Sequence, residues 1–373
     1  MKFVSDKSNL LKALNSVVRA SSSRTTMPIL EGILIQTNEN QVKFTTYDLE
    51  LGIEYVIDCE VIEQGNTVVT ASMFSEIIRK LPDTDISITV NDKELLIIEC
   101  EGSLYKLATM NPMEFPELPR VDEENSVTLE QHDLKEMIRK TIFAVSIETH
   151  RPIFTGCLFE IKNNKINVVA VDGYRLGWKS KYLENPVNDF KVVIPGKTLN
   201  EVNKILSDSF ESVKISVAKN QALFEMENCK IVTRLLEGEF LDYERVIPKN
   251  FETRIRVDKK ELQECFERVS LISMSSIEKE RKYPVKVSID IGKVVISCKN
   301  QAGDAKEELF LTTEGKNLEV GFNPKYFLDV LKNIEDDEVY VNFGTSISPS
   351  IIESTEEDGD YKYMILPIRL KND

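Results

Sequence analysis

The stretch Pro28-Ile29-Leu30-Glu31-Gly32 returns later in the chain as Pro152-Ile153-Phe154-Thr155-Gly156. The two stretches lie 124 residues apart, and other identities occur at the same offset, namely Ala20/Ala144 and Asp48/Asp172. A proline, a glycine and an acid rarely agree at one offset by chance. We therefore expect an internal repeat, and a period of this length indicates repeated domains rather than a solenoid of small units.

Two sets of predicted helices follow the same period. The first set carries apolar residues at i, i+3, i+4 spacing, on the faces Leu10, Leu11, Leu14, Val17 and Val18; Leu134, Met137, Ile138, Ile142 and Val145; Leu262, Cys265, Phe266, Val269 and Ile272. The second set has the faces Phe74, Ile77, Ile78 and Leu81; Leu199, Val202, Ile205 and Leu206; Phe327, Val330, Leu331 and Ile334. We expect Thr70 to cap the first helix of this set, and Pro195 and Asn323-Pro324 to suit the opening turns of the other two.

Alternating strands and turn residues fill the space between the helices. The predicted hairpins join residues 33–36 to 42–45, 158–161 to 166–169, and 287–289 to 294–296. Each repeat is therefore expected to be an α+β domain with two helices packed on antiparallel sheets. The expected domains are residues 1–123, 124–248 and 249–373, divided near Asp122-Glu123-Glu124-Asn125 and Pro248-Lys249-Asn250.

Composition describes a globular protein with an acidic surface. The 373 residues are 42% hydrophobic and 29% charged, with a formal charge of −15. No apolar run reaches the ~20 residues of a membrane helix, and the first residues lack the apolar stretch of a signal peptide, so we expect a cytoplasmic protein. The six cysteines form no CxxC pair and sit in apolar alternation. We expect them to be reduced core residues rather than zinc ligands or disulfides.

The sequence shows no catalytic or metal-binding motif. Gly196-Lys197-Thr198 ends like a phosphate-binding loop, but the glycine required five residues earlier is Lys191, so a helix start is the better interpretation. The two histidines lack metal-ligand spacing. For Asp48 and Asp172 a turn or capping role is favoured over acid–base chemistry, and Trp178 is expected to pack on a strand face rather than stack on a base. We expect no cofactor, no metal and no active site.

Positive charge concentrates on the predicted helices. The six helical windows (residues 6–24, 72–81, 130–146, 195–206, 258–272 and 323–334) together carry +5, which leaves −20 for the rest of the chain. If the helices line the inside of an arc of domains, the protein has a basic inner surface behind an acidic exterior. Such a surface makes sequence-independent contacts with phosphates. Ordinary solvated helix faces explain the same count equally well.

The chain resembles the DNA polymerase III beta subunit family of sliding clamps over its whole length. The matching stretches are Arg24 with Pro28-Ile29-Leu30; Phe115-Pro116-Glu117-Leu118-Pro119; Arg151-Pro152-Ile153-Phe154-Thr155-Gly156; Asp172-Gly173-Tyr174-Arg175-Leu176; Glu237-Gly238-Glu239-Phe240-Leu241-Asp242-Tyr243; Asn323-Pro324-Lys325-Tyr326; and Leu366-Pro367-Ile368-Arg369-Leu370. The resemblance implies a head-to-tail homodimer, in which six domains form a ring around double-stranded DNA. It also implies loading by an ATP-driven clamp loader, and tethering of the replicative DNA polymerase and repair factors through short peptides. An enzyme or small-molecule-binding protein with a site between repeated domains is the alternative.

The resemblance further implies a peptide-binding pocket at the second and third domains. Its expected residues are Phe154, Val171, Gly173, Tyr174, Arg175, Leu176, Leu241, Arg245, Val246, Tyr326, Met364, Leu366, Pro367, Ile368 and Arg369. Leu241 departs from the family, which usually has proline at this position, so the shape of the pocket is expected to differ there.

Two more groups of residues follow from the resemblance and from helix position. The residues expected to face DNA are Arg24, Arg79, Lys197 and Lys204. At the dimer interface, Tyr105 and Leu107 on an edge strand are expected to meet Leu271 and Ile272 of the other copy, with Glu307 and Glu308 as ionic support. An apolar strand edge left open would promote aggregation, and a closed head-to-tail contact removes that liability.

Overall fold

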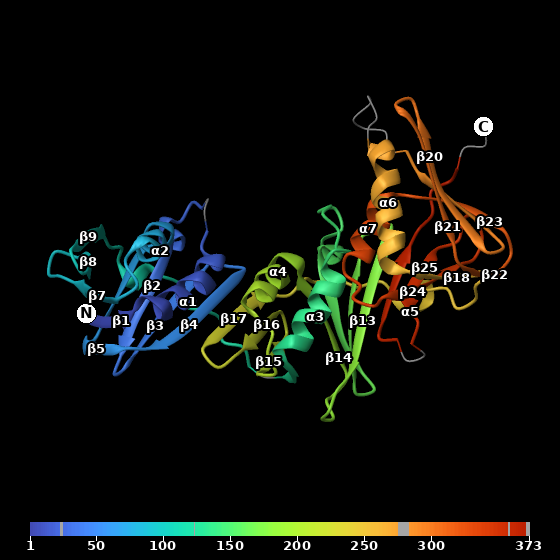
Figure 1. The fold of residues 1–373 in the computed structure, drawn as a ribbon. Coiled ribbons are helices and arrows are strands. Elements are labelled where there is room, and N and C mark those ends of the chain that lie inside the picture. The colour runs from blue at the N-terminus through green and yellow to red at the C-terminus, as the bar shows by residue number, and fades with distance from the viewer. Residues whose placement is uncertain (23–24, 123, 275–282, 357–358, 371–373) are drawn as a thin grey trace. The chain divides into compact units, whose positions relative to one another are not determined.

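The computed structural model describes residues 1–22, 25–122, 124–274, 283–356 and 359–370 (Figure 1). The chain divides into two compact units, one formed by Met1–His132 with Glu201–Leu235 and the other by Asp133–Asn200 with Leu236–Asp373. None of the helices in the described ranges is long and apolar enough to cross a membrane.

One order of elements occurs three times along the chain, except that the described middle third has no counterpart of the short strand β5. In the first third it runs β1 (Lys2–Asp6), α1 (Lys7–Val17), β2 (Gly32–Asn38), β3 (Gln41–Tyr47), β4 (Leu51–Asp58), β5 (Glu60–Glu63), β6 (Gly65–Thr70), α2 (Ala71–Lys80), β7 (Asp85–Val90), β8 (Leu95–Cys100), β9 (Ser103–Ala108). In the middle third it runs β10 (Asn125–Glu130), α3 (Gln131–Ile142), β11 (Gly156–Lys162), β12 (Lys165–Val171), β13 (Arg175–Tyr182), β14 (Phe190–Pro195), α4 (Gly196–Ile205), β15 (Ser212–Ala218), β16 (Gln221–Glu225), β17 (Cys229–Arg234).

The last third follows the same order after a short helix, α5 (Tyr243–Val246), that the sequence did not predict. It runs β18 (Thr253–Asp258), α6 (Lys259–Met274), β19 (Val285–Asp290), β20 (Lys293–Asn300), β21 (Gly303–Phe310), β22 (Thr312–Gly315), β23 (Leu318–Phe322), α7 (Pro324–Leu331), β24 (Glu338–Phe343), β25 (Ser350–Ser354), β26 (Tyr361–Ile365). The six predicted helices and the three predicted hairpins are confirmed.

The described strands form antiparallel sheets, two of which run across the repeats. The first unit contains a sheet of order β5-β1-β7-β8-β9 and another of order β10-β15-β16-β17-β4-β3-β2-β6. The second unit contains a sheet of order β14-β11-β12-β13-β26-β25-β24-β18-β22 and another of order β21-β20-β19-β23. Two repeats are therefore joined wherever β4 pairs with β17 and wherever β13 pairs with β26.

The helices bury the apolar faces that the spacing predicted. Leu10 and Leu14 of α1 are buried, as are Phe266 and Val269 of α6. Burial of each such side chain stabilises the fold by about 1.5–3 kcal/mol. In the third repeat Phe266 stacks on Phe327 of α7 at a ring-centroid distance of 4.5 Å, which fixes one helix against the other.

The repeated glycines lie where a strand passes close to its neighbour. A Cβ on Gly32 would approach Val68 Cγ1 to 2.4 Å, and a Cβ on Gly156 would approach the Ile194 carbonyl oxygen to 2.4 Å. Both glycines begin the strand that follows a 3₁₀ turn opened by the repeated proline. The sequence identity at this offset thus reflects one packing requirement met twice.

Helix starts agree only partly with the capping predictions. Asn323 accepts a hydrogen bond from the Lys325 amide at 3.1 Å, and Pro324 opens α7 as expected. Thr70 precedes α2, but its side chain makes no capping hydrogen bond, so that prediction is wrong. Thr70 is also the last residue of β6, where it pairs with Gly32, and the end of that strand sets the helix start.

The predictions for cysteine and tryptophan are confirmed. All six cysteines are free thiols; five are buried, and Cys59 is half-buried. Burial raises the pKa of the Cys59 thiol to about 11, which keeps it protonated. Trp178 packs against the apolar cluster of β11 to β13 and donates its indole N–H to Asn167 Oδ1 at 3.1 Å.

Candidate functional sites

The turn between β12 and β13 is closed by an aspartate, as its sequence position predicted. Asp172 Oδ1 accepts hydrogen bonds from the amides of Tyr174 (2.9 Å) and Arg175 (3.1 Å). Gly173 between them has φ +88°, a conformation that glycine adopts without strain. The structure therefore confirms the turn role of Asp172.

Arg175 lies beneath the surface rather than on it. Its guanidinium contacts Asp172 at 3.0 Å, Asp329 of α7 at 2.5 Å and the Phe143 carbonyl oxygen at 2.6 Å. It also lies over the Tyr326 ring, 4.8 Å from the centroid. The side chain is only 8% exposed, so its main effect is to hold α7 and the β12–β13 turn together.

Two tyrosines form the exposed part of this surface. Tyr174 is 57% exposed and stacks on Tyr326, with ring centroids 6.1 Å apart and planes inclined by 20°. Burial raises the pKa of the Tyr326 hydroxyl, with a further contribution from the Asp172 carboxylate. The Arg175 guanidinium packs against Tyr326, so the aromatic pair rests on an ion-paired base.

An apolar cluster lies in the same unit and holds six of the fifteen predicted pocket residues. Val171, Leu176 and Met364 belong to its buried core. Phe154, Leu241 and Val246 are partly buried and pack against that core. The cluster therefore joins side chains from the second and third repeats. At the position where the family usually has proline, Leu241 adds a flexible aliphatic side chain to its rim.

The C-terminal segment crosses this region in an extended form. The Leu366 amide donates to the Tyr174 carbonyl oxygen at 2.8 Å, and the Ile368 amide donates to the Gly321 carbonyl oxygen at 2.7 Å. Pro367 lies between these two contacts, and Ile368 is 37% exposed. The backbone is therefore held at two points, and the side chains of Ile368 and Arg369 are left available to a ligand. We call Phe154, Tyr174, Tyr326 and the segment 364–369, with the apolar cluster beneath them, the candidate peptide site.

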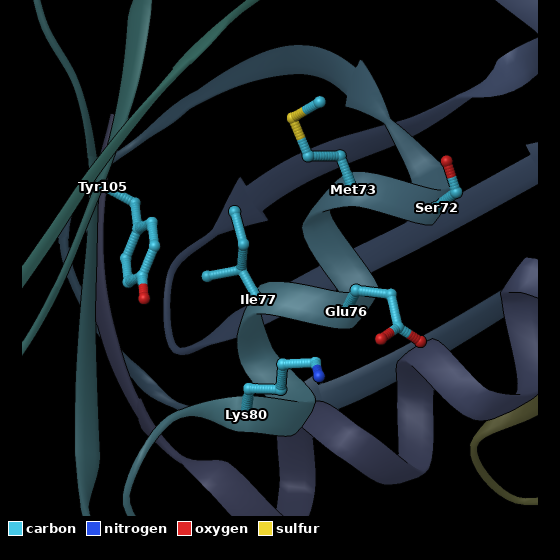
Figure 2. A pocket seen from close by; sticks show the side chains of 6 residues that line it. All are labelled: Ser72, Met73, Glu76, Ile77, Lys80 and Tyr105. Atoms are coloured by element: carbon cyan, nitrogen blue, oxygen red, sulfur yellow. The ribbon is translucent and has the colours of Figure 1, made fainter.

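A second apolar surface lies between α2 and the edge strand β9. A hollow of about 420 Å³ opens there, lined by Ser72, Met73, Glu76, Ile77, Lys80 and Tyr105. Figure 2 shows Tyr105 beside Ile77, with Met73 on the turn before it. Tyr105 is 42% exposed, whereas Leu107 is 9% exposed and belongs to the core of its own sheet. Of the predicted pair, only Tyr105 offers apolar area to another molecule.

The surface predicted to meet that hollow lies on α6 and β21. Leu271 is 70% exposed, while Ile272 packs against the core of its own repeat. Glu307 pairs with Arg268 at 3.0 Å, and Glu308 pairs with Lys293 at 2.8 Å and Lys306 at 2.7 Å. The hydrogen bonds from these lysines hold the pKa of Glu308 at about 2. Both predicted glutamates thus already have partners within the chain.

Sequence profiles of the three domains of the DNA polymerase III beta subunit match this chain. The N-terminal profile covers residues 1–119, the central profile 128–242 and the C-terminal profile 244–369. The chain belongs to this family. The beta sliding clamp of Staphylococcus epidermidis is 35% identical over 379 residues, covering 99% of each chain. The matches show the three-domain clamp fold. Members of this family are accessory subunits of DNA polymerase III and not enzymes themselves.

Solved clamp structures have the same fold. The DNA polymerase sliding clamp of Bacillus subtilis superposes with a TM-score of 0.94 at 34% identity, covering 100% of both chains. A putative DNA polymerase III beta subunit from Eubacterium rectale gives 0.93 at 37% identity, covering 99% of this chain and 100% of its own. A Pseudomonas aeruginosa sliding clamp bound to griselimycin gives 0.94 at 28% identity and covers the same shares.

Three of the four residues predicted to face DNA lie on described helices. Arg24 lies outside the described residues. Arg79 is exposed on α2 and pairs with Glu76, and Lys204 on α4 pairs with Glu201 at 2.8 Å. Lys197 is exposed near the start of α4, where Gly196-Lys197-Thr198 begins the helix as expected.

Glu201 of α4 pairs with two cationic side chains, one of which is Lys204. Its carboxylate also accepts a hydrogen bond from Arg19 at 3.0 Å. Burial alone would raise the pKa of Glu201, but Lys204 and Arg19 together bring it below its usual range. The carboxylate therefore stays ionised and holds two cationic side chains.

The structure places one predicted residue of the peptide site, Arg245, on the surface and reveals two residues that the sequence did not predict. Arg245 is 86% exposed and pairs with Asp242 at 2.8 Å, so its guanidinium is accessible to a ligand. Asp329 and Phe143, which hold Arg175, were missed by the sequence analysis. The available signal for Asp329 was its place one turn after Tyr326 on the same predicted helix.

Proposed function

We propose that two copies of this chain close head to tail into a ring around double-stranded DNA, where they tether the replicative DNA polymerase. Membership of the sliding clamp family supports this role. The observation that carries it is the set of strand pairs that join one repeat to the next. We take the repeats as residues 1–123, 124–248 and 249–373.

Equivalent strands make both joints within the chain. β4 of the first repeat pairs with β17 of the second, with Ile53 opposite Ile231. β13 of the second repeat pairs with β26 of the third, with Gly177 opposite Tyr363. In the order of elements, β4 corresponds to β13, and β17 corresponds to β26. Each joint is therefore the same antiparallel pair of strands.

The same order leaves one such pair incomplete. β21 is the equivalent of β4 and β13 in the third repeat, and β9 is the equivalent of β17 and β26 in the first. In the described chain each of them ends its sheet, β21 beside β20 and β9 beside β8. Pairing of β21 in one copy with β9 in another gives all three repeats the same joint. Two copies then close a ring of six domains, in which the edges of β9 and β21 are no longer open.

The charge distribution supports DNA as the molecule inside the ring. The six helical windows together carry +5 within a chain of formal charge −15, and Arg79, Lys197 and Lys204 are exposed on helices. Contacts of this kind with phosphates are independent of sequence and weaken with salt. Retention by ring closure makes tight binding unnecessary.

The candidate peptide site supports docking of partner proteins. Its exposed aromatic pair, apolar cluster and extended C-terminal segment suit a short apolar peptide. We propose that the polymerase, repair factors and the clamp loader use this site, and that the protein acts in the cytoplasm, where free thiols such as its six are stable. The family gives no support to the alternative of an enzyme with a small-molecule site between repeats.

Retention on circular DNA tests the proposed ring. The protein is loaded onto nicked circular duplex, and the bound fraction is measured by gel filtration before and after one restriction cut. We expect retention on the circle and loss within minutes of linearisation, since the ring slides off a free end. Equal retention on circular and linear DNA contradicts the proposal.

A further inference from the structure

The strand pairs within the chain also define the register of the joint between copies. At the first joint Lys230 of β17 lies opposite Glu54 of β4. At the second joint Lys362 of β26 lies opposite Trp178 of β13. The positions of β9 and β21 that correspond to these residues follow from the hairpins.

The hairpin β8–β9 and its equivalents β16–β17 and β25–β26 show which residue of β9 corresponds to these lysines. Glu99, Glu225 and Glu353 occupy the same position in β8, β16 and β25, and all three are glutamates. The residues opposite them on the next strand are Leu104, Lys230 and Lys362. Leu104 of β9 is therefore the equivalent of the two lysines at the internal joints.

The second hairpin places β21 in the same way. Its outer end pairs Lys293 with Phe310, as Gln41 pairs with Asp58 in the first repeat and Lys165 with Tyr182 in the second. At equal distances from that end, Lys306 corresponds to Glu54 and Trp178, and Asp304 corresponds to Gly52 and Leu176.

We infer that β9 of one copy pairs with β21 of the other so that Leu104 lies opposite Lys306 and Lys106 lies opposite Asp304. The inference rests on the proposed head-to-tail ring and specifies its interface. Lys106 and Asp304 are both exposed. Neither makes an ion pair with any residue in the described part of its own chain. The joint between copies therefore contains a new cross-strand salt bridge, present twice in the ring.

The two faces of the paired strands agree with this register. On β9, Tyr105 and Leu107 point to the side covered by α2, since Tyr105 lines the hollow with Ile77. On β21, Ala305 packs toward the core of its repeat, while Asp304 is exposed on the other face. The register puts Tyr105 opposite Ala305 on the helix side and leaves both charges on the solvent side. A slip of one residue would place side chains of one strand on the wrong face.

A shift of β21 by two residues along β9 keeps each side chain on its face of the sheet but separates Lys106 from Asp304. Shifting β21 by two residues in one direction puts Lys106 opposite Lys306, which is a repulsive pair. Shifting it by two in the other direction puts Lys106 opposite Ala302, which has no charge. Since directly opposed like charges destabilise a sheet, the inferred register is favoured over both neighbours.

The second joint shows what Leu271 does in the ring. Phe143 follows α3 at the position that Leu271 occupies on α6, counted from Gln131 and Lys259. Phe143 packs on Tyr363 of β26 with ring centroids 5.6 Å apart. Tyr363 is the equivalent of Tyr105, because each follows its aligned residue Lys362 or Leu104. Leu271 of one copy is thus directed to Tyr105 of the other, where the hollow receives it.

Cysteine pairs in the full-length chain test the register. Lys106→Cys with Asp304→Cys is the paired variant, and Lys106→Cys with Lys306→Cys is the off-register control. Directly opposed Cα atoms lie about 4.5–5.5 Å apart, within disulfide range, whereas diagonal ones lie about 7–8 Å apart. We expect mild oxidation to link most of the first variant into covalent dimers on non-reducing gels and little of the second. The single-cysteine variants show the background from the six native thiols.

Light scattering on the reduced proteins measures whether the chain is a dimer, and so it distinguishes a failure of the register from a failure of the proposed ring. A dimer that links at 106/304 and hardly at 106/306 supports the register. A dimer that links preferentially at 106/306, or at neither pair, overturns the register and leaves the ring standing. A wild-type chain that is monomeric at tens of micromolar overturns the register and the ring together.

Charge reversal checks the salt bridge without relying on cysteine chemistry. Lys106→Asp and Asp304→Lys are each expected to weaken the dimer roughly tenfold, because each change enters both interfaces of the ring. The double variant is expected to recover most of the wild-type affinity. Additive weakening in the double variant, measured by analytical ultracentrifugation, contradicts the pairing.

Discussion

Residues Asp48-Leu49-Glu50-Leu51 and Asp172-Gly173-Tyr174-Arg175 form equivalent turns, each just before a strand that joins two repeats. In both turns the first aspartate accepts hydrogen bonds from the amides two and three residues later. In both, the carbonyl of the third residue accepts a hydrogen bond from the end of the joining strand, from Arg234 at 3.0 Å in one case and from Leu366 at 2.8 Å in the other. The backbone is thus the same twice.

The side chains on these two turns differ at every position after the aspartate. Leu51 is an apolar core residue, whereas its equivalent Arg175 is a buried cation that binds Asp172 and Asp329. Glu50 is a solvated acid, whereas its equivalent Tyr174 stacks on Tyr326. The candidate peptide site therefore arises by substitution on a turn that the repeat already supplied, and the first turn remains as an unmodified reference.

Replacing Arg175 with the residue of the first turn gives the largest expected effect. Arg175→Leu leaves Asp329 without its cation in a poorly solvated position, and should lower the free energy of unfolding by about 3 kcal/mol. Urea unfolding followed by circular dichroism measures the change. Arg175→Leu combined with Asp329→Leu should recover part of the loss, since the unpaired charge of Asp329 is gone while Asp172 keeps its two backbone hydrogen bonds. A single variant within 1 kcal/mol of wild type would show that Arg175 is not holding α7.

The exposed tyrosine provides the next test. Tyr174→Ala should weaken binding of a fluorescent peptide from the clamp-binding segment of a replicative polymerase roughly tenfold, since an aromatic wall is lost. Stability should change by less than about 0.5 kcal/mol, because the side chain is exposed. Glu50→Ala at the equivalent position is the matched control and should leave affinity unchanged. Equal losses in the two variants would mean that the second turn is not specialised for peptides.

The backbone conformation of the two turns gives a smaller expected change in the free energy of unfolding. Leu49 has φ +73° and Gly173 has φ +88°, a region in which a side chain costs about 1–2 kcal/mol. Leu49→Gly should therefore raise the free energy of unfolding by up to about 1 kcal/mol, and Gly173→Ala should lower it by about 1 kcal/mol. A Cβ at Gly173 would meet no atom within 4 Å, so backbone strain alone is measured. Opposite signs in thermal unfolding would contradict this account of the turns.

Acid titration gives the smallest effect and concerns Glu136 of α3, which pairs with Lys140 and with Lys179 of β13. Burial raises the pKa of Glu136, but hydrogen bonds and charge from Lys140 and Lys179 outweigh it and leave the pKa below its usual value. Because the folded state then binds fewer protons than the unfolded state, the contribution of Glu136 is complete above about pH 5. It is lost as the pH falls below about 4. Glu136→Gln should flatten the fall in unfolding free energy between pH 5 and pH 3. An unchanged slope would assign the acid sensitivity to other carboxylates.

The sequence predicted the repeated fold well because its signals are local. Apolar spacing placed all six repeated helices, and the glycines at 32 and 156 marked equivalent strand starts. The family resemblance then supplied most of the candidate peptide site, including Val171, Leu176 and Met364, which do meet in one cluster.

Other features depended on contacts between residues far apart in the chain. Asp329 lies 154 positions from Arg175, and no local pattern marks the pair. The burial of Arg175, Leu107 and Ile272 could not be predicted for the same reason, since burial is decided by elements that pack on a strand or helix from elsewhere.

The sequence by itself determined that three similar domains exist, because periodic burial and turn chemistry are written into each segment. Only the tertiary structure decided which strands are used up within the chain and which are left at an edge, since strand pairing joins segments more than a hundred residues apart. Among the strands left at an edge, β9 and β21 are the equivalents of the strands that join two repeats within the chain. They are therefore the surfaces with which a second copy is proposed to close the ring.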